Sequence, residues 1–169
     1  MIKMPFEGAS IFFLDAARSI DVEDLEGELV QIVVDLPEGS EATAETLWSR
    51  RITSNRFRLL NVPVWAYGLA YEDIVEGVLD EDQRIHFVRL FARSGLFTVR
   101  AAGPNANPDA FSSLVDTLKG RSVAVEAVSD SYVAFAMERE SYDDCQSIID
   151  QAEAGGAIFV EVANDDEPQ

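Results

Sequence analysis

The hydrophobic period of the sequence changes at Gly103-Pro104, and this change restricts the fold more than any other feature. After it, residues 107–120 and 141–155 repeat apolar side chains at helical spacing. Strand-like runs surround the two predicted helices, at residues 96–102, 122–128, 131–137 and 157–163. The order strand, helix, strand, strand, helix, strand predicts a ferredoxin-like half with both helices on one face of its sheet.

The ends of the predicted helices carry capping signals. Asn107 is a favourable N-cap residue, Pro108 is favourable at the first helical position, and Gly120 is placed to end the helix. The second helix is predicted to begin at Ser141, with Asp144 three residues on as a weak capping box. The predicted inner faces are Phe111, Leu114, Val115 and Leu118 on the first helix, and Cys145, Ile148, Ile149 and Ala152 on the second.

The first half of the chain is predicted to be rich in β-structure. Its candidate strands lie at residues 9–14, 28–36, 45–52, 56–60, 73–79 and 84–93, with turn residues between them. Short strands with close turns indicate a small antiparallel sheet or barrel. We therefore predict an α+β fold with a β-rich half at 1–93, a ferredoxin-like half at 94–164 and an acidic tail at 165–169.

The net charge of −18 is distributed unevenly along the 169 residues. Residues 1–49 carry −9 and residues 101–169 carry −11, whereas residues 50–100 hold eight arginines against six acidic residues. A field of this sign disfavours nucleic acid and anionic membrane surfaces as partners and favours a basic protein. The alternative is that the acidity serves only solubility.

The single cysteine, Cys145, excludes an internal disulfide and any metal site built from several cysteines. No run approaches the roughly 18 apolar residues of a membrane span. We read no signal peptide at the N-terminus and expect a cytoplasmic location with no membrane association.

No residue set in the sequence predicts catalysis, a metal site or a cofactor. His86 is the only histidine and lies in a predicted strand, where a half-exposed structural role is the simpler interpretation. Cys145 falls on the apolar face of a predicted helix, beside acidic neighbours that disfavour a reactive thiolate. An enzyme built on Arg93, Ser94 and Arg100 is the least favoured class.

Acidic side chains cluster at several places along the chain. None has the spacing of a calcium loop. They are either a solvated surface or a contact face for a basic protein. The clusters taken as candidate partner-binding residues are Glu23, Asp24 and Glu26, then Asp80, Glu81 and Asp82, then Asp143 and Asp144.

The stretch from Arg56 to Gly77 holds Asn61-Val62-Pro63, which restricts the backbone and predicts a change of direction. We expect Trp65, Tyr67 and Tyr71 to cover the open end of a small sheet, and the carboxylate of Asp73 to accept backbone N–H groups. The functional alternative is a recognition patch of these aromatic residues, with Arg93 and Arg100 as its cations.

This part of the sequence resembles a bacterial domain family of unknown function. The matching residues are Leu47-Trp48, Arg56, Arg58-Leu59, Asn61, Pro63, Ala66, Gly68, Asp73, Val75-Glu76, Arg93-Ser94-Gly95, Thr98 and Arg100. Leu96 and Phe97 stand where the family pattern has histidine and serine, and Glu72 stands where it has glycine. The resemblance runs from about Glu28 to Ala163 and implies no mechanism.

Two classes of function remain open. The first is an acidic protein-binding module of the immunity type, which neutralises a basic toxin or enzyme by occluding its surface. The alternative is a small-molecule-binding regulatory domain that uses the ferredoxin-like sheet.

Overall fold

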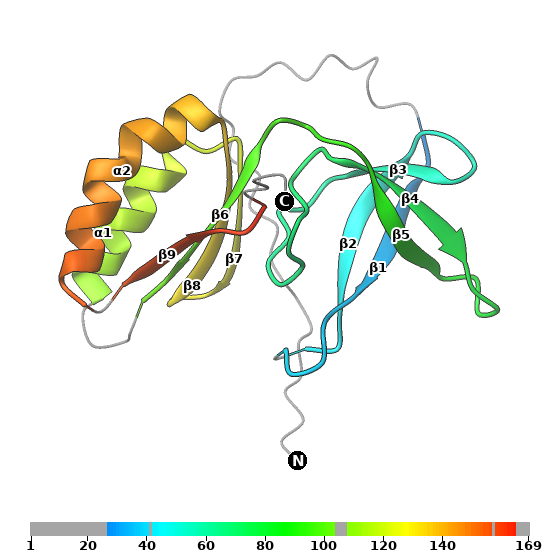
Figure 1. The fold of residues 1–169 in the computed structure, drawn as a ribbon, viewed down its shortest axis with the longest axis horizontal. Coiled ribbons are helices and arrows are strands. Elements are labelled where there is room, and N and C mark those ends of the chain that lie inside the picture. The colour runs from blue at the N-terminus through cyan, green and yellow to red at the C-terminus, as the bar shows by residue number, and fades with distance from the viewer. Residues whose placement is uncertain (1–26, 41, 104–107, 157, 165–169) are drawn as a thin grey trace, which may run out of the picture.

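The computed structural model describes residues 27–40, 42–103, 108–156 and 158–164. Within these residues the chain forms nine strands and two helices, with mainly antiparallel sheets, so the α+β class is confirmed. Figure 1 shows two bodies side by side: a small barrel and a sheet that carries both helices on its outer side.

The first body is a closed barrel of five strands in chain order. The strands are β1 (Leu29–Asp35), β2 (Ala44–Arg51), β3 (Arg56–Leu59), β4 (Ile74–Leu79) and β5 (Ile85–Ala92). Neighbouring strands pair antiparallel, and a short parallel contact of Ile32 with Ile85 closes the barrel. The barrel core contains Ile32, Leu47, Phe57, Leu59 and Val75, which alternate with outward-facing residues along their strands.

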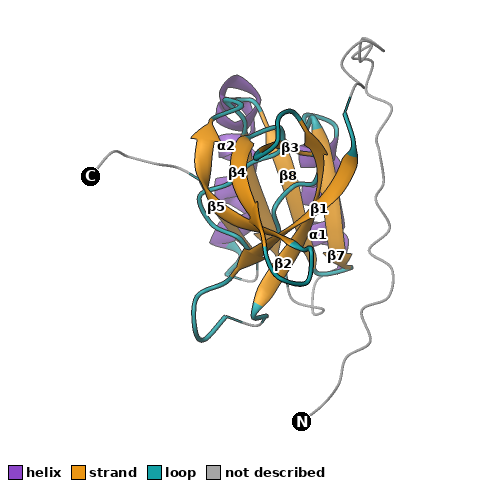
Figure 2. Cartoon of the chain, turned by 90° about the vertical axis from the view of Figure 1, so that its right-hand side faces the viewer, coloured by secondary structure: helices purple, strands orange, loops and turns teal. Residues whose placement is uncertain are grey.

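The second body is a four-stranded antiparallel sheet in the order β7-β8-β6-β9. Its elements in chain order are β6 (Phe97–Ala102), α1 (Pro108–Lys119), β7 (Ala124–Ser129), β8 (Tyr132–Met137), α2 (Arg139–Ala154) and β9 (Phe159–Val162). Both helices lie on the same side of the sheet, as Figure 1 shows, and Figure 2 views the molecule from the barrel with the helices behind.

Apolar residues at helical spacing bury the helix side of this sheet. Phe111, Leu114 and Leu118 of α1 and Cys145 and Ile149 of α2 are buried in one cluster with residues of β6 and β8. Their spacing is the amphipathic pattern expected from the sequence.

Two details of α2 differ from the sequence-based prediction. The helix begins at Arg139, two residues before Ser141, and its N-cap Glu138 makes no side-chain capping bond. The predicted capping box at Ser141 is therefore wrong. Ile148 is exposed rather than buried, because the contact face of α2 is narrow and centres on Cys145 and Ile149. The predicted strand at 9–14 and the N-cap Asn107 lie outside the described residues.

Strand β9 lies at an edge of the second sheet and pairs on its inner side with β6. The backbone N–H of Val160 donates a 2.8 Å hydrogen bond to the Glu153 carboxylate. A side chain near the end of α2 therefore satisfies an edge-strand N–H group that has no neighbouring strand to bind. No helix in the part of the chain that the structure describes is long and apolar enough to cross a membrane.

Candidate functional site

The long connection between β3 and β4, residues 60–73, joins the two bodies. Its buried residues Val62, Val64 and Ala70 pack in one cluster with Ala134 and Ala136 of β8. These alanines face away from the helices, because their neighbours in β8 belong to the helix-side cluster. The connection therefore covers the second face of the sheet, and the predicted structural corner is the layer that holds the two bodies together.

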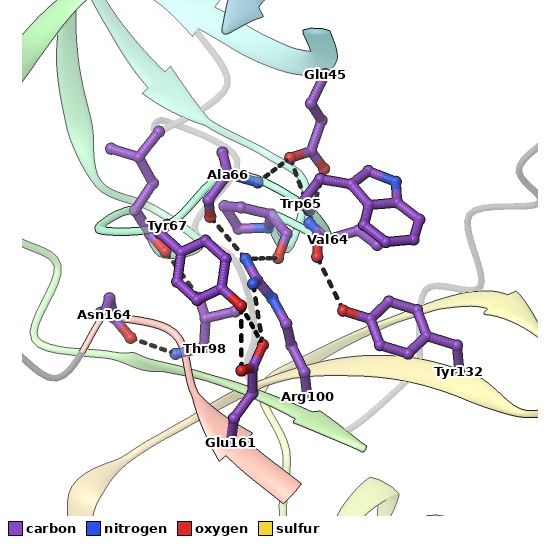
Figure 3. Close-up of polar contacts among 12 residues, drawn as sticks. Glu45, Val64, Trp65, Ala66, Tyr67, Thr98, Arg100, Tyr132, Glu161 and Asn164 are labelled. Carbon is purple, nitrogen blue, oxygen red and sulfur yellow. Dashed lines mark hydrogen bonds and ion pairs between the residues drawn. The ribbon is translucent and has the colours of Figure 1, made fainter. Parts of the chain in front are cut away.

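Glu45 of β2 binds the start of this connection from the barrel side. Its carboxylate is buried and accepts three backbone N–H groups, from Val64 at 2.7 Å, Trp65 at 3.0 Å and Ala66 at 2.7 Å (Figure 3). Charge-assisted bonds of this kind are about twice as strong as neutral ones. The carboxylate fixes the backbone of residues 64–66 in one conformation.

Arg100 of β6 binds the same segment from the sheet side, and only 2% of its surface is exposed. One terminal nitrogen donates to the carbonyl of Ala66 at 2.7 Å and lies 3.5 Å from that of Pro63. The other donates to Glu161 Oε1 at 3.2 Å, and the guanidinium carbon lies 4.4 Å from the centre of the Tyr67 ring (Figure 3). The Arg100 Nε is buried with no hydrogen-bond partner. Arg100 is therefore a buried structural residue, so the alternative in which it is a cation of a surface recognition patch is wrong.

Asp73 binds the end of the connection. Its carboxylate is fully buried and accepts the backbone N–H groups of Ala70 at 2.9 Å and Ser94 at 2.7 Å, as the sequence predicted for this residue. Burial raises the pKa of Asp73, against the lowering effect of these two hydrogen bonds. Arg93 lies 3.7 Å from the carboxylate and donates to the carbonyl of Gly68 at 2.6 Å.

Two further polar residues complete the attachment. Asn61 accepts the Trp48 N–H at 2.6 Å and donates to the Glu126 carboxylate at 2.8 Å, so one amide joins β2 to β7. Burial is the main cause that raises the pKa of Glu126. The hydroxyl of Thr98 donates to the carbonyl of Leu69 at 2.9 Å. Each end and the middle of the connection are therefore held by specific hydrogen bonds.

An aromatic surface remains on the outside of this rigid layer. We define the aromatic patch as Trp65, Tyr67, Tyr132 and Phe159. Tyr67 is 64% exposed and donates its hydroxyl to Glu161 at 2.9 Å, a bond that raises the pKa of Tyr67. Trp65 stacks on Tyr132 at 5.2 Å between ring centroids.

Phe159 extends the patch along β9. It lies two residues before Glu161 and on the same face, because Val160 and Val162 pack on the helix side. The strand register places Phe159 opposite Ala102, and Ala102 opposite Tyr132. With 70% of its surface exposed, Phe159 is the most exposed of the large apolar residues in the described part of the chain. The patch therefore spans the sheet end beside Tyr67.

The residues predicted to bind a partner are not gathered at one place. Trp65 and Tyr67 lie in the aromatic patch, whereas Tyr71 is half-buried in the interface between the two bodies. Asp80, Glu81 and Asp82 form the turn of the β4–β5 hairpin, and Asp143 and Asp144 lie on α2, on the other body. Glu23, Asp24 and Glu26 lie outside the described residues.

Some of these carboxylates already have partners within the molecule. Asp80 accepts the backbone N–H of Arg84 at 2.8 Å and contacts His86 Nε2 at 3.0 Å. The Arg84 backbone bond is the main cause that lowers the pKa of Asp80. Asp144 pairs with Arg121 at 3.0 Å.

Sequence reasoning missed Glu45, Glu161 and Phe159. Alternation in β2 places Glu45 on the same face as the buried Leu47, and a carboxylate on an apolar face is the one signal that could have singled it out. Glu161 and Phe159 alternate with the two valines of β9 that pack on the helix side. This alternation predicts that they share the opposite face, but not that Tyr67 lies beside them.

The residues that carry the family resemblance are mostly those that hold the connection: Asn61, Pro63, Ala66, Gly68, Asp73, Arg93, Ser94, Thr98 and Arg100. A family model described as Domain of unknown function (DUF4265) matches residues 45–159, which is more than half of the chain. The chain belongs to this family. The DUF4265 match begins at Glu45 and ends at Phe159, so it includes the attachment and all of the aromatic patch.

A solved structure shares the fold of this DUF4265 protein. It is the crystal structure of a hypothetical protein from Neisseria gonorrhoeae, with a TM-score of 0.66 and 19% sequence identity. The alignment covers 80% of this chain and 94% of that one. At this identity the likeness concerns the fold alone. No curated protein matches the chain.

Proposed function

We propose that this DUF4265 protein is a protein-binding module whose contact surface is the aromatic patch and whose partner is basic. The observation that carries the proposal is Tyr67, which is 64% exposed although its hydroxyl and ring are fixed by Glu161 and Arg100. Exposed Trp and Tyr side chains dominate the binding energy of protein interfaces.

The hydrogen bonds that hold the connection, residues 60–73, support this role. A loop that is already ordered loses little conformational entropy when a partner binds, so more of the contact energy appears as affinity. The bonds from Glu45, Arg100, Asp73 and Asn61 order this loop in the free protein.

The charge of the chain supports a basic partner. A net charge of −18 accelerates association with a cationic protein, and Glu161 places a carboxylate within the patch. We further propose an immunity-type function, in which the module occludes the surface of a basic toxin or enzyme in the cytoplasm. Asp80, Glu81, Asp82, Asp143 and Asp144 would then attract the partner over a distance rather than form one contact face.

The alternative, a small-molecule-binding regulatory domain, has less support. We infer that the second body is ferredoxin-like, which is supported by its element order and by the strand order β7-β8-β6-β9. A ligand cleft on that sheet would need an uncovered face. Helices cover one face and the 60–73 connection packs against the other, which favours the protein-binding proposal.

Affinity capture tests the proposal with a matched pair of variants. The tagged wild-type protein is expected to retain a basic protein from its native host at low salt and to release most of it at high salt. Tyr67→Ala should lower the affinity for that protein by about tenfold or more, since hot-spot truncations cost about 2 kcal/mol or more. Ile148→Ala, a control on the exposed side of α2, should leave the affinity unchanged.

Two results would contradict the proposal. The first is that both variants lose affinity equally, or that neither loses any, which would place the contact elsewhere. The second is a captured partner that is acidic and whose association does not depend on salt. The immunity function itself is tested by co-expression: the captured protein should impair growth alone and not when the module is present.

A further inference from the structure

The outer face of the barrel at β3, β4 and β5 differs from the rest of this acidic molecule. We define the arginine face as Arg56, Arg58, Ile74, Glu76, Val88, Arg89 and Phe91. We infer that this face is a second interaction surface, which binds an acidic peptide segment of a partner protein that also carries apolar side chains. The inference is independent of the aromatic patch, which lies on the 60–73 connection and the second body.

The strand register brings three arginines together. Arg56 of β3 lies opposite Glu76 of β4, and Glu76 lies opposite Arg89 of β5. Arg58, two residues after Arg56 in β3, lies opposite Ile74. Residues two apart in a strand share a face, so the three guanidinium groups project from the same side of the barrel.

Two of these arginines, Arg56 and Arg89, share one carboxylate. Glu76 accepts a 2.7 Å hydrogen bond from Arg89 Nε and lies 3.5 Å from Arg56 Nε. The Nε of Arg56 is buried without a hydrogen-bond partner. Within the described residues, Arg58 makes no hydrogen bond or ion pair. The face therefore carries more positive charge than its own carboxylate neutralises.

The arrangement also has a cost for stability. Arg58 lies directly opposite Arg50 of β2, whose guanidinium donates to the carbonyl of Gly27. Like charges opposite each other on adjacent strands are destabilising, by roughly 0.2–1 kcal/mol. An anionic group bound beside Arg58 would reduce this repulsion.

Two β-bulges add apolar groups to the arginine face. The β4–β5 register shifts between Ile74 and Val75 and again between Glu76 and Gly77, which leaves Phe91 and Val88 of β5 without a partner on β4. Phe91 is 43% exposed and Val88 is 55% exposed. The Arg56 guanidinium stacks on the Phe91 ring at 3.5 Å. Bulges re-aim side chains, and they are over-represented next to functional sites.

The chemistry of the face favours an acidic peptide over other occupants. Arginine forms paired hydrogen bonds with carboxylates, and Phe91 and Val88 offer contact for apolar side chains. Nucleic acid binding relies on many phosphate contacts, whereas the three arginines of this face neutralise only a few anionic groups. The net charge of −18 also repels a long polyanion more strongly than a short peptide with few carboxylates. A second copy would bring together two molecules of that same charge.

Fluorescence anisotropy of the full chain tests the inference. The probe is a short labelled peptide of glutamate, leucine and glycine, compared with the same peptide carrying lysine for glutamate and with a single-stranded thymidine oligonucleotide. The wild-type protein is expected to bind the glutamate peptide and neither of the others. Arg58→Gln should weaken that binding by about tenfold. Because Arg58 makes no bond within the described residues, this variant should fold normally.

Arg121→Gln provides the matched control. Arg121 is half-exposed and pairs with Asp144 on the other body, so the variant has the same change of charge at a distant place. Its peptide affinity should equal that of the wild type. Equal weakening by both variants would show a nonspecific charge effect and overturn the inference.

Three other outcomes overturn the inference. Preferential binding of the oligonucleotide would assign the face to nucleic acid. Concentration-dependent sedimentation that Arg58→Gln abolishes would assign it to a second copy. Absence of peptide binding by the wild type would mean that the face is closed to an added peptide.

Discussion

Arg100 and Arg58 are both arginines that project from a strand, and the molecule uses them in opposite ways. Arg100 is 2% exposed, donates to two residues and lies against a tyrosine ring. Arg58 lies half-buried on the barrel surface with no bond within the described residues, opposite a second arginine. The first arginine fixes the fold, because a buried charge allows only the arrangement that satisfies it. The second is available to a partner, because the fold does not depend on it.

The sharpest test of this contrast applies one substitution to both residues. Arg100→Met should lower the free energy of unfolding by about 1–3 kcal/mol, mainly because it leaves the Ala66 carbonyl without its buried donor, whereas Glu161 is exposed enough to be solvated. Arg58→Met should change it by no more than about 0.5 kcal/mol. Urea denaturation measures both. Equal losses would mean that Arg58 is structural and would remove the contrast.

A second test concerns the other charge that holds the connection. Glu45→Gln keeps the shape of the side chain but removes the charge from a group that accepts three backbone N–H bonds, so we expect a loss of about 1.5–3 kcal/mol in the free energy of unfolding. Glu38→Gln, in an exposed turn of the barrel, should stay within about 0.5 kcal/mol. A Glu45→Gln variant as stable as the control would show that the carboxylate does not hold the loop.

The smallest expected effect concerns how the contributions of two carboxyl groups to the free energy of unfolding depend on pH. The groups are Asp73 in the connection and Glu76 on the arginine face. Burial raises the pKa of Asp73, so the folded protein keeps this proton to a higher pH than the unfolded chain does. The contribution of Asp73 to stability is therefore fully present below the ordinary carboxyl pKa of about 4 and falls as the pH rises above it. The hydrogen bond from Arg89 lowers the pKa of Glu76, so its contribution is present above that value and falls as the pH drops.

Two variants separate these slopes. Between about pH 3.5 and pH 7, the stability advantage of the wild type over Asp73→Asn should shrink as the pH rises, and its advantage over Glu76→Gln should grow. Urea unfolding at a series of pH values gives both differences. Slopes of the same sign would show that the two carboxyl groups have similar environments.

The sequence predicts much of the second body and of the attachment. Spacing of Phe111, Leu114 and Leu118 predicts the buried face of α1, and the Asn-Val-Pro turn predicts a corner. The role of Asp73 as an acceptor of backbone N–H groups follows from its position before a strand. These features depend on neighbours in the chain, which a sequence shows directly.

What the sequence hides depends on contacts between distant segments. Glu45 binds residues about twenty positions away, and no period links the two. From the sequence, Arg100 is one of the eight arginines of residues 50–100, and nothing near it in the chain shows that residues 60–73 cover it. The sequence shows where the acidic clusters are along the chain, but only the fold shows that Asp80–Asp82 and Asp143–Asp144 lie on different bodies.

The bond between the Val160 N–H and the Glu153 carboxylate has a consequence for how the molecule behaves at high concentration. Strand β9 is an edge that carries an exposed phenylalanine, a combination that invites strands of other molecules to pair and grow into aggregates. Because the Glu153 carboxylate binds the outward N–H of Val160, that group cannot pair with an added strand, and the negative charge repels a second acidic chain. The molecule can therefore display Phe159 to a partner without becoming a nucleus for sheet growth.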